Sequence, residues 1–152
     1  MRALGVDLGR RRVGVAVSDT AGALATPHTT IVRDDASPDA WLDELVRLVD
    51  DLGVGTVVVG MPLSLDGRRT AAARQAQAAA ESLRRALGDR PVTVDTVDER
   101  LTTVTAERSL AEAGRRGRER RQVVDRAAAT VLLQAWLDRQ RHRRVPAGEG
   151  GG

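Results

Sequence analysis

Three acidic residues could place their carboxylates in one site. Asp7 ends an apolar segment near the N-terminus, Glu99 follows a second such segment, and Asp125 lies in a long helical pattern. Clustered carboxylates repel one another, and a hard divalent cation such as Mg²⁺ or Mn²⁺ compensates because it prefers oxygen ligands. Two such ions about 4 Å apart can activate a water and stabilise a leaving oxygen. The three acids therefore suggest metal-dependent hydrolysis of a phosphodiester bond.

Each acid also has an ordinary structural interpretation. Asp7 could form an Asx turn with the residues that follow it. Glu99 could pair with Arg100 or cap a helix, and Asp125 could be a solvated acid on a helix surface. Spacing alone does not decide between a metal site and three separate structural acids.

Hydrophobic periodicity predicts the elements that must position these acids. A helix should start at an N-cap on Ser37, with Pro38 in its first turn, and should end at Gly53. The predicted strands cover 3–8, 13–17, 25–32, 56–60 and 91–97, and the further helices cover 69–87, about 102–113 and 120–141.

This order of elements predicts an α/β fold. The first three strands can pair antiparallel, whereas the last two need helical crossovers and so lie parallel. The result is a five-stranded mixed sheet flanked by helices on both faces. Sites in such sheets form at the carboxyl ends of strands. Asp7 and Glu99 are placed there, and a helix that crosses this edge could bring Asp125 to them.

The bulk composition fits one domain. The chain has 152 residues, and we expect a single domain over 1–144 followed by a flexible glycine-rich tail over 145–152. It has no cysteine, which excludes disulfides and thiolate metal sites and suits a cytoplasmic location. A long apolar run and a leader segment are both absent, so we expect neither a membrane span nor secretion.

All 24 basic residues are arginine. The planar guanidinium suits phosphate, so a polyanionic partner is plausible, although a coding bias explains the excess equally well. Near the predicted site, the candidates for contact with nucleic acid are Arg12, Arg100, Arg118, Arg120 and Arg121. A structural salt bridge is an equally good interpretation of Arg12.

Four segments in a fixed order resemble the motifs of one family. They are Leu4-Gly5-Val6-Asp7-Leu8-Gly9 with Arg12 to Asp19, Val58-Val59-Gly60-Met61-Pro62-Leu63-Ser64-Leu65-Asp66-Gly67, Asp98-Glu99-Arg100-Leu101-Thr102-Thr103, and Val124-Asp125-Arg126-Ala127-Ala128-Ala129. The family is that of the YqgF-type pre-16S rRNA nucleases, also described as Holliday-junction-resolvase-like. The resemblance runs from about residue 4 to residue 137.

The resemblance implies an RNase H-like fold and a nuclease. It implies that Asp7, Glu99 and Asp125 are the catalytic and metal-binding residues, with Mg²⁺ or Mn²⁺ as cofactor. The implied activity is processing of the 5′ end of precursor 16S rRNA in the bacterial cytoplasm. We expect the RNA as partner, which could be bound on the ribosome, and a monomer or a homodimer. In one departure, arginines stand at 118, 120 and 121 where the family usually has lysines.

Two further functions compete with this one. The chain could resolve branched DNA such as a Holliday junction, which was the older inference for the family. It could also be a non-catalytic RNA-binding factor in ribosome assembly or transcription. A sugar kinase with a similar phosphate loop needs two related domains, for which this chain is too short.

Overall fold

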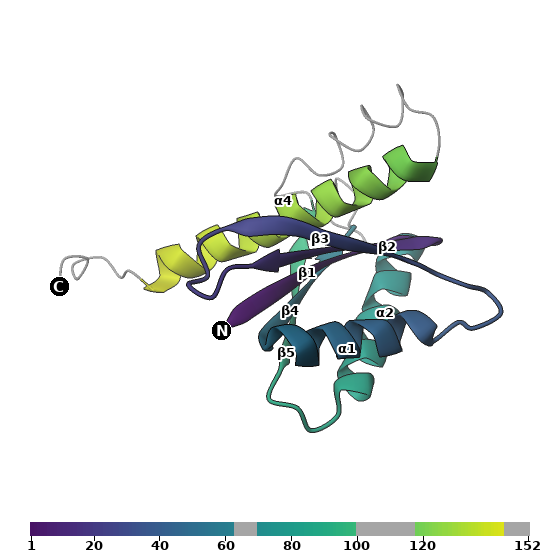
Figure 1. Ribbon diagram of the computed structural model, residues 1–152, viewed down its shortest axis with the longest axis horizontal. Coiled ribbons are helices and arrows are strands. Elements are labelled where there is room, and N and C mark those ends of the chain that lie inside the picture. Colours follow the sequence, from purple (N-terminus) through teal and green to yellow (C-terminus); the bar gives the residue numbers. More distant parts are fainter. Residues whose placement is uncertain (63–69, 100–117, 145–152) are drawn as a thin grey trace.

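The computed structural model describes residues 1–62, 70–99 and 118–144, with the side chains of these residues except those of 118–125 and 144. The strands in these ranges form one sheet (Figure 1). They are β1 (Arg2–Leu8), β2 (Arg12–Ser18), β3 (Ala25–Val32), β4 (Val54–Met61) and β5 (Thr93–Asp98). The helices are α1 (Ala40–Leu52), α2 (Ala71–Leu87) and α4 (Arg118–Arg144).

The sheet has the predicted mixed topology, with the strand order β3-β2-β1-β4-β5. β2 is antiparallel to both β1 and β3. β4 is parallel to β1, with Val59 beside Val6, and it is also parallel to β5, with Val59 beside Thr96. Because α1 and α2 serve as crossovers, the carboxyl ends of β1, β4 and β5 meet at one edge of the sheet. We call this the carboxyl edge.

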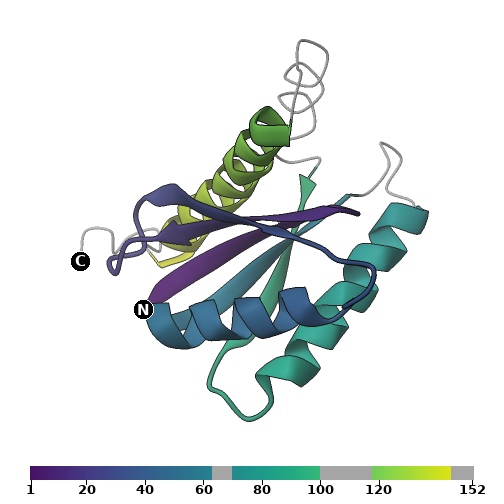
Figure 2. The ribbon, with the colours of Figure 1, turned by 45° about the vertical axis from the view of Figure 1, so that its right-hand side comes forward.

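Helices cover both faces of the sheet, as predicted. α1 and α2 pack on one face and α4 packs on the other (Figure 2). Alternation along each strand explains this division, since successive side chains point to opposite faces. The core against α1 and α2 includes Leu4, Val6, Val13, Val15, Leu45, Val57, Val59 and Leu83. The core against α4 includes Ala3, Ala16, Val58, Val97, Ala129, Leu132 and Leu133.

A tight turn after β1 fixes the end of that strand. The backbone N–H of Gly9 donates to the carbonyl of Arg12 at 2.9 Å. A Cβ on Gly9 would lie 2.7 Å from that same carbonyl oxygen, so only glycine fits without a shift. The Arg33 guanidinium donates to the Gly9 carbonyl at 2.8 Å and lies over the ring of Trp41 at 5.1 Å from its centroid. This turn, which we call the hairpin corner, is thereby tied to α1.

The predicted start of the first helix is wrong by two residues. α1 begins at Ala40, after Asp39 as its N-cap, and the Asp39 side chain makes no capping hydrogen bond. Ser37 instead belongs to a preceding turn, in which its N–H donates to Asp34 and its carbonyl accepts from Ala40. Proline occupies that turn because its fixed φ suits a turn as well as a first helical residue.

Other predicted boundaries are confirmed. Gly53 ends α1 in the left-handed conformation, with φ 66° and its N–H donating to Val49. Gly88 follows the last residue of α2. The helix predicted over about 102–113 and the tail over 145–152 lie outside the described residues, and the division of the chain into domain and tail stays a prediction. No helix in the described ranges is long and apolar enough to cross a membrane.

Two carboxylates on the surface have lowered pKa values. The backbone N–H groups of Ala23 and Leu24 donate to Asp19 and hold its pKa below the usual range. The Arg90 guanidinium donates two hydrogen bonds to Asp50 and lowers the pKa of that carboxyl. A carboxyl whose pKa is lower in the folded state stabilises the fold at pH values above its unfolded-state pKa. This contribution is lost as the pH falls through the pKa of the folded state. Since both groups are exposed, the contribution is small.

The N-cap of α2 provides a test of the helix boundary. The Thr70 hydroxyl accepts from the N–H of Ala73 at 3.2 Å. We expect Thr70→Ala to lower the free energy of unfolding by about 1 kcal/mol, because an N–H in the first turn loses its partner. Urea unfolding followed by circular dichroism measures the change. Thr20→Ala, at an exposed turn position, is the control and should stay within about 0.5 kcal/mol; equal losses in the two variants would contradict the capping role.

Candidate metal site at the carboxyl edge

Asp7 lies at the carboxyl edge on the face that α4 covers. Ala3 and Gly5 of the same strand both contact α4 residues, and alternation puts Asp7 on that face too. Only 3% of Asp7 is exposed. A carboxylate removed from water to this extent is costly unless hydrogen bonds or cations compensate it. A buried carboxylate of this kind is typical of a functional site and unusual for a surface acid.

Glu99 reaches the same face from β5. It follows Asp98, the last residue of that strand, and is 7% exposed. A Cβ built on Gly60 of β4 would lie 3.1 Å from Oε2 of Glu99 and 2.6 Å from Cδ1 of Leu132. The Glu99 side chain therefore turns inward over β4, toward β1, and occupies space that glycine leaves open.

The two acids flank one strand. The pairing register continues from Val6 beside Val59 to bring Asp7 level with Gly60. With strands about 4.8 Å apart, β1 and β5 are separated by about 10 Å across β4. Glu99 reaches inward over Gly60, and Asp7 lies on the same face in the strand on the other side of that glycine, so both acids border the space beside Gly60. The structure thus brings together two of the three predicted acids.

α4 approaches the sheet closely beside this space. A Cβ on Gly5 would lie 2.7 Å from Cβ of Leu133 and 2.9 Å from the carbonyl oxygen of Ala129. Contact this close is available only where the strand has no side chain. Gly5 and Gly60 therefore let α4 lie against β1 and β4 with little between them.

The backbone of Asp125 lies near the same level of the sheet. α4 runs antiparallel to β1, since Leu137 packs with Ala3 and Ala129 lies over Gly5. Asp7 is two residues beyond Gly5, about 7 Å along the strand. Asp125 is one turn before Ala129, about 6 Å along the helix. Its side chain lies outside the described part, so its place in the site stays a prediction.

The other predicted contacts are described only in part. Arg12 begins β2, is half-buried, and shares the α4 face with Gly14, which pairs with Asp7. It therefore lies at the carboxyl edge beside the acids. Arg100 and the side chains of Arg118, Arg120 and Arg121 fall outside the description. Within the described ranges, no group of three or more potential metal ligands forms a cluster.

Sequence reasoning missed the two glycines that make room for the site. Gly5 and Gly60 were placed only as members of motifs and strands, yet both face α4 and one lies between the acids. A glycine within or at the end of a buried strand is a signal for close backbone approach. That signal was present in the sequence at both positions.

Comparison with solved structures defines the class of protein. The fold is similar to that of Thermus thermophilus RuvC in complex with a Holliday junction substrate, with a TM-score of 0.61 and 14% identity over 93% of this chain and 96% of RuvC. The fowlpox virus Holliday junction resolvase gives a TM-score of 0.54 at 10% identity, over 92% of this chain and 99% of that one. At such identities the likeness shows the fold alone, which is the RuvC-like form of the RNase H fold.

The sequence comparison then gives the family. The model of the RuvX family, described as Holliday junction resolvase, matches residues 1–139. A Mycobacterium relative (strain KMS) is 47% identical over 99% of this chain and 87% of its own length. A Rhodococcus opacus relative (strain B4) is 46% identical over 99% of this chain and 84% of its own. Both carry the name "Putative pre-16S rRNA nuclease". This chain belongs to the RuvX family of resolvase-like nucleases.

Substitution of Gly5 tests the close approach of α4. We expect Gly5→Ala to destabilise the protein by about 1–3 kcal/mol, because the added methyl group meets helix backbone that cannot yield locally. Gly55→Ala in β4 is the matched control, since its Cβ would meet only the side chain of Met1, which is 82% exposed and can move aside. Thermal unfolding of both variants measures the difference. If Gly5→Ala were as stable as Gly55→Ala, the packing argument would be wrong.

Proposed function

We propose that this chain is a metal-dependent nuclease that processes the 5′ end of precursor 16S rRNA in the bacterial cytoplasm. Asp7, Glu99 and Asp125 hold Mg²⁺ or Mn²⁺ in this proposal. The observation that carries it is the pair of buried acids, Asp7 and Glu99, which lie on one face of the sheet in the strands on either side of Gly60. The names of the relatives point to the same substrate.

The donor set fits a hard divalent cation. Asp7 and Glu99 offer only oxygen, and the chain has no cysteine to favour a softer metal. Asp7 and Glu99 are 3% and 7% exposed, and a divalent cation would offset the repulsion between two carboxylates this far from water. Gly60 keeps the space between them free of a side chain. When bound, Mg²⁺ or Mn²⁺ would supply an activated water and stabilise the departing oxygen.

The chain's own residues supply position and charge around that chemistry. Asp7 is held by a buried strand that ends at the hairpin corner, and Glu99 lies beside Gly60, where Leu132 of α4 also approaches the sheet. Arg12 lies on the same face at the same edge, where its guanidinium can contact a phosphate beside the bond that is cut. Rigid placement of this kind lowers the barrier because the reacting groups need little reorganisation.

Branched DNA is the second candidate substrate. The family description, Holliday junction resolvase, favours it. A DNA junction and a single-stranded RNA end would both place a phosphodiester group in the site. The carboxylates therefore do not discriminate between these two substrates. Parallel cleavage assays on precursor 16S rRNA and on a four-way DNA junction decide between them, and the substrate with the higher kcat/KM is the preferred one.

Loss of one carboxylate tests the catalytic assignment. We expect Asp7→Asn, Glu99→Gln and Asp125→Asn each to reduce cleavage of precursor 16S rRNA with Mg²⁺ by at least about a hundredfold, since each removes a charged metal ligand. Gel analysis of the 5′ end measures the rate. Glu44→Gln, at an exposed position on α1, serves as control. Turnover that stays at the wild-type level in Asp7→Asn would reject the catalytic assignment of Asp7. RNA binding without cleavage by the wild-type protein would instead favour a non-catalytic RNA-binding factor.

Binding of metal can be tested without any substrate. We expect Mn²⁺ at a hundred times its Kd to stabilise the wild-type protein by about 2.7 kcal/mol, because it binds the folded state alone. Asp7→Asn should lose most of this stabilisation, whereas Glu44→Gln should keep it. Thermal unfolding with and without EDTA provides the measurement. Equal Mn²⁺ stabilisation of Asp7→Asn and wild type would place the metal elsewhere.

A further inference from the structure

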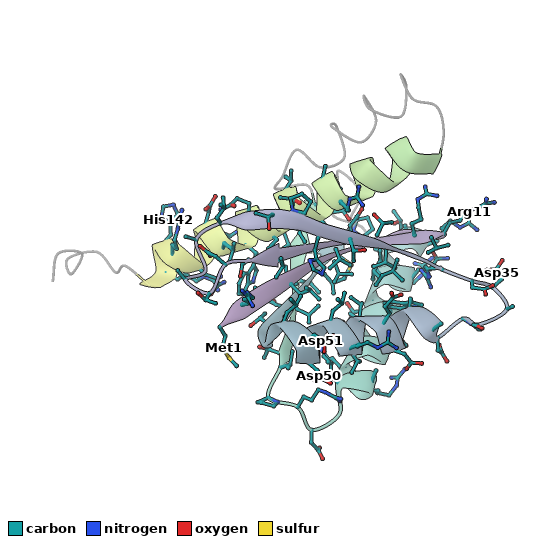
Figure 3. All side chains as sticks on the ribbon, in the orientation of Figure 1. Met1, Arg11, Asp35, Asp50, Asp51 and His142 are labelled. Carbon is teal, nitrogen blue, oxygen red and sulfur yellow. The ribbon has the colours of Figure 1, made fainter. Side chains whose placement is uncertain are left out.

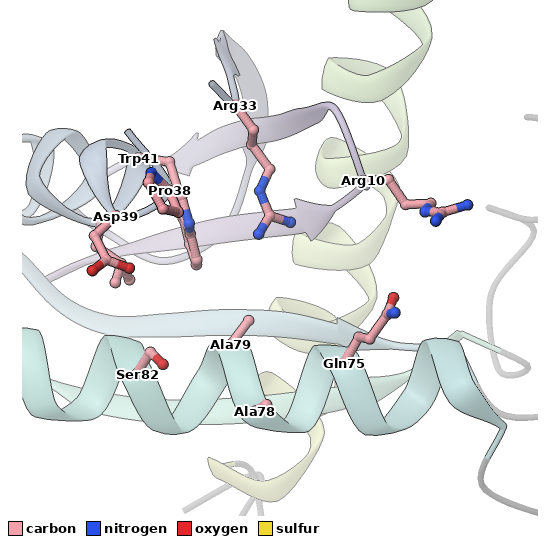
Figure 4. Close-up of a pocket in the computed structure, with 10 residues that line it drawn as sticks. Arg10, Arg33, Pro38, Asp39, Trp41, Gln75, Ala78, Ala79 and Ser82 are labelled. Carbon is pink, nitrogen blue, oxygen red and sulfur yellow. The ribbon is translucent and has the colours of Figure 1, made fainter. Parts of the chain in front are cut away.

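A groove lies on the face of the sheet opposite to the carboxylates. It has a volume of about 450 Å³ and opens between the start of α1, one side of α2 and the hairpin corner (Figure 4). Arg10 and Gln75 stand at one end of it, whereas Asp39 and Ser82 stand at the other. The volume is within the range of sites for small organic molecules. The metal site and the substrate assignment make no use of this groove.

Small side chains on α2 create the groove. The side of α2 that lines the groove consists of residues at helical spacing. They are Ala78, Ala79 and Ser82, with the longer Gln75 at one end. Across from them lie Trp41 and Leu42 of α1, which are 4% and 7% exposed. Because alanine reaches only one carbon from the backbone, α1 and α2 do not close against each other here. The groove therefore has an apolar floor and polar ends.

The cations of the groove have capacity left for an anion. Arg33 is half-buried. One of its N–H groups donates to the Gly9 carbonyl, and its guanidinium lies over Trp41. A guanidinium has five N–H donors. Arg10 is exposed at the end of the groove. Within the described residues neither arginine pairs with a carboxylate, and Asp39 at the far end is the single acid in the lining.

The groove begins where the carboxyl edge ends. Arg10 follows Asp7 by three residues, so their Cα atoms are at most about 11 Å apart. The Gly9 carbonyl that Arg33 holds belongs to the same turn. A strand that passes over the hairpin corner can therefore contact Asp7 on one face of the sheet and Arg10 and Arg33 on the other.

We propose that this groove binds an unpaired nucleotide of the RNA strand, beyond the bond that is cut. The phosphate on one side of the nucleotide contacts Arg33, the phosphate on its other side contacts Arg10 at the end of the groove, and its sugar and base lie against Ala78 and Ala79. The inference rests on the proposed function, since it assigns a second contact to the same substrate. A nucleotide suits the groove because it joins an anion to a flat, weakly polar body of comparable size.

RNA binding by groove variants tests the proposal directly. Kd for a single-stranded 5′ extension of precursor 16S rRNA is measured by fluorescence anisotropy in EDTA, so that no cleavage occurs. We expect Arg10→Gln to weaken binding about tenfold, as for loss of one charge-assisted hydrogen bond. The slope of log Kd against log salt should fall by about 1. Arg47→Gln, an exposed arginine on α1 away from the groove, should change neither.

Filling the groove separates its shape from its charge. Ala78→Leu places a larger side chain in the groove and should weaken RNA binding by a similar factor. Ala72→Leu, at another exposed alanine of α2 outside the lining, is the matched control for helix propensity and hydrophobicity. Circular dichroism confirms that both variants fold. A twofold or smaller effect of both Ala78→Leu and Arg10→Gln would overturn the proposal.

The absence of cysteine allows a third measurement. Gln75→Cys introduces a single thiol at the groove, to which a short photo-crosslinker is attached, and Asp89→Cys does the same at a remote exposed turn. We expect RNA to crosslink to the first protein and not to the second, and adenosine monophosphate at millimolar concentration should compete only weakly. Strong competition by the mononucleotide, together with RNA binding that ignores Ala78→Leu, would assign the groove to a free nucleotide and reject the proposal.

The two proposals fail in different ways. If wild type neither binds nor cuts the RNA, the proposed function is wrong. If wild type cuts the RNA and loses activity in Asp7→Asn, but the groove variants bind as wild type does, only the groove assignment is wrong.

Discussion

The close approach of α4 to the sheet is the constraint on which the rest of the structure depends. Gly5 and Gly60 carry no side chain toward this helix, and any Cβ there would overlap Leu133, Leu132 or the Ala129 carbonyl. The same absence of side chains leaves the space that Glu99 enters beside Asp7. One packing requirement therefore sets both the position of a core helix and the room for a polar site. A larger residue at either glycine would disturb both together.

Side chains fill the space on both faces of the sheet (Figure 3). The hairpin corner lies where these two faces meet at the end of β1. Arg33 holds the Gly9 carbonyl and lies over Trp41, so that the end of β1 is tied to α1. Asp7 projects from this fixed strand toward α4, whereas Arg10 and Arg33 border the groove on the side of α1 and α2. An arginine in such a place acts through packing and through a hydrogen bond to a neutral carbonyl, as well as through its charge.

Much of the fold could be predicted because it follows from local pattern. Hydrophobic periodicity is clear in the apolar runs of β1, β2 and β4 and in the apolar faces of α1 and α2. The crossover connections then require β4 and β5 to lie parallel. The start of α1 was misplaced because Ser37-Pro38 satisfies the rules for a turn and for a helix start alike. Competition between two local structures is settled by tertiary contacts, which single positions do not reveal.

The sequence by itself determined the family, the order of the elements and the acidic residues at strand ends, since motifs, periodicity and connection lengths are properties of the chain. Tertiary structure decided what spacing in the chain cannot express. Asp7 and Glu99 are 92 positions apart in the sequence, yet both are buried at one edge of the sheet because β4 inserts between β1 and β5 and presents Gly60 between them. It also decided that alanines of α2 face Trp41 across an open groove. Both results depend on which surfaces meet, and that is fixed only when the sheet and its helices pack together.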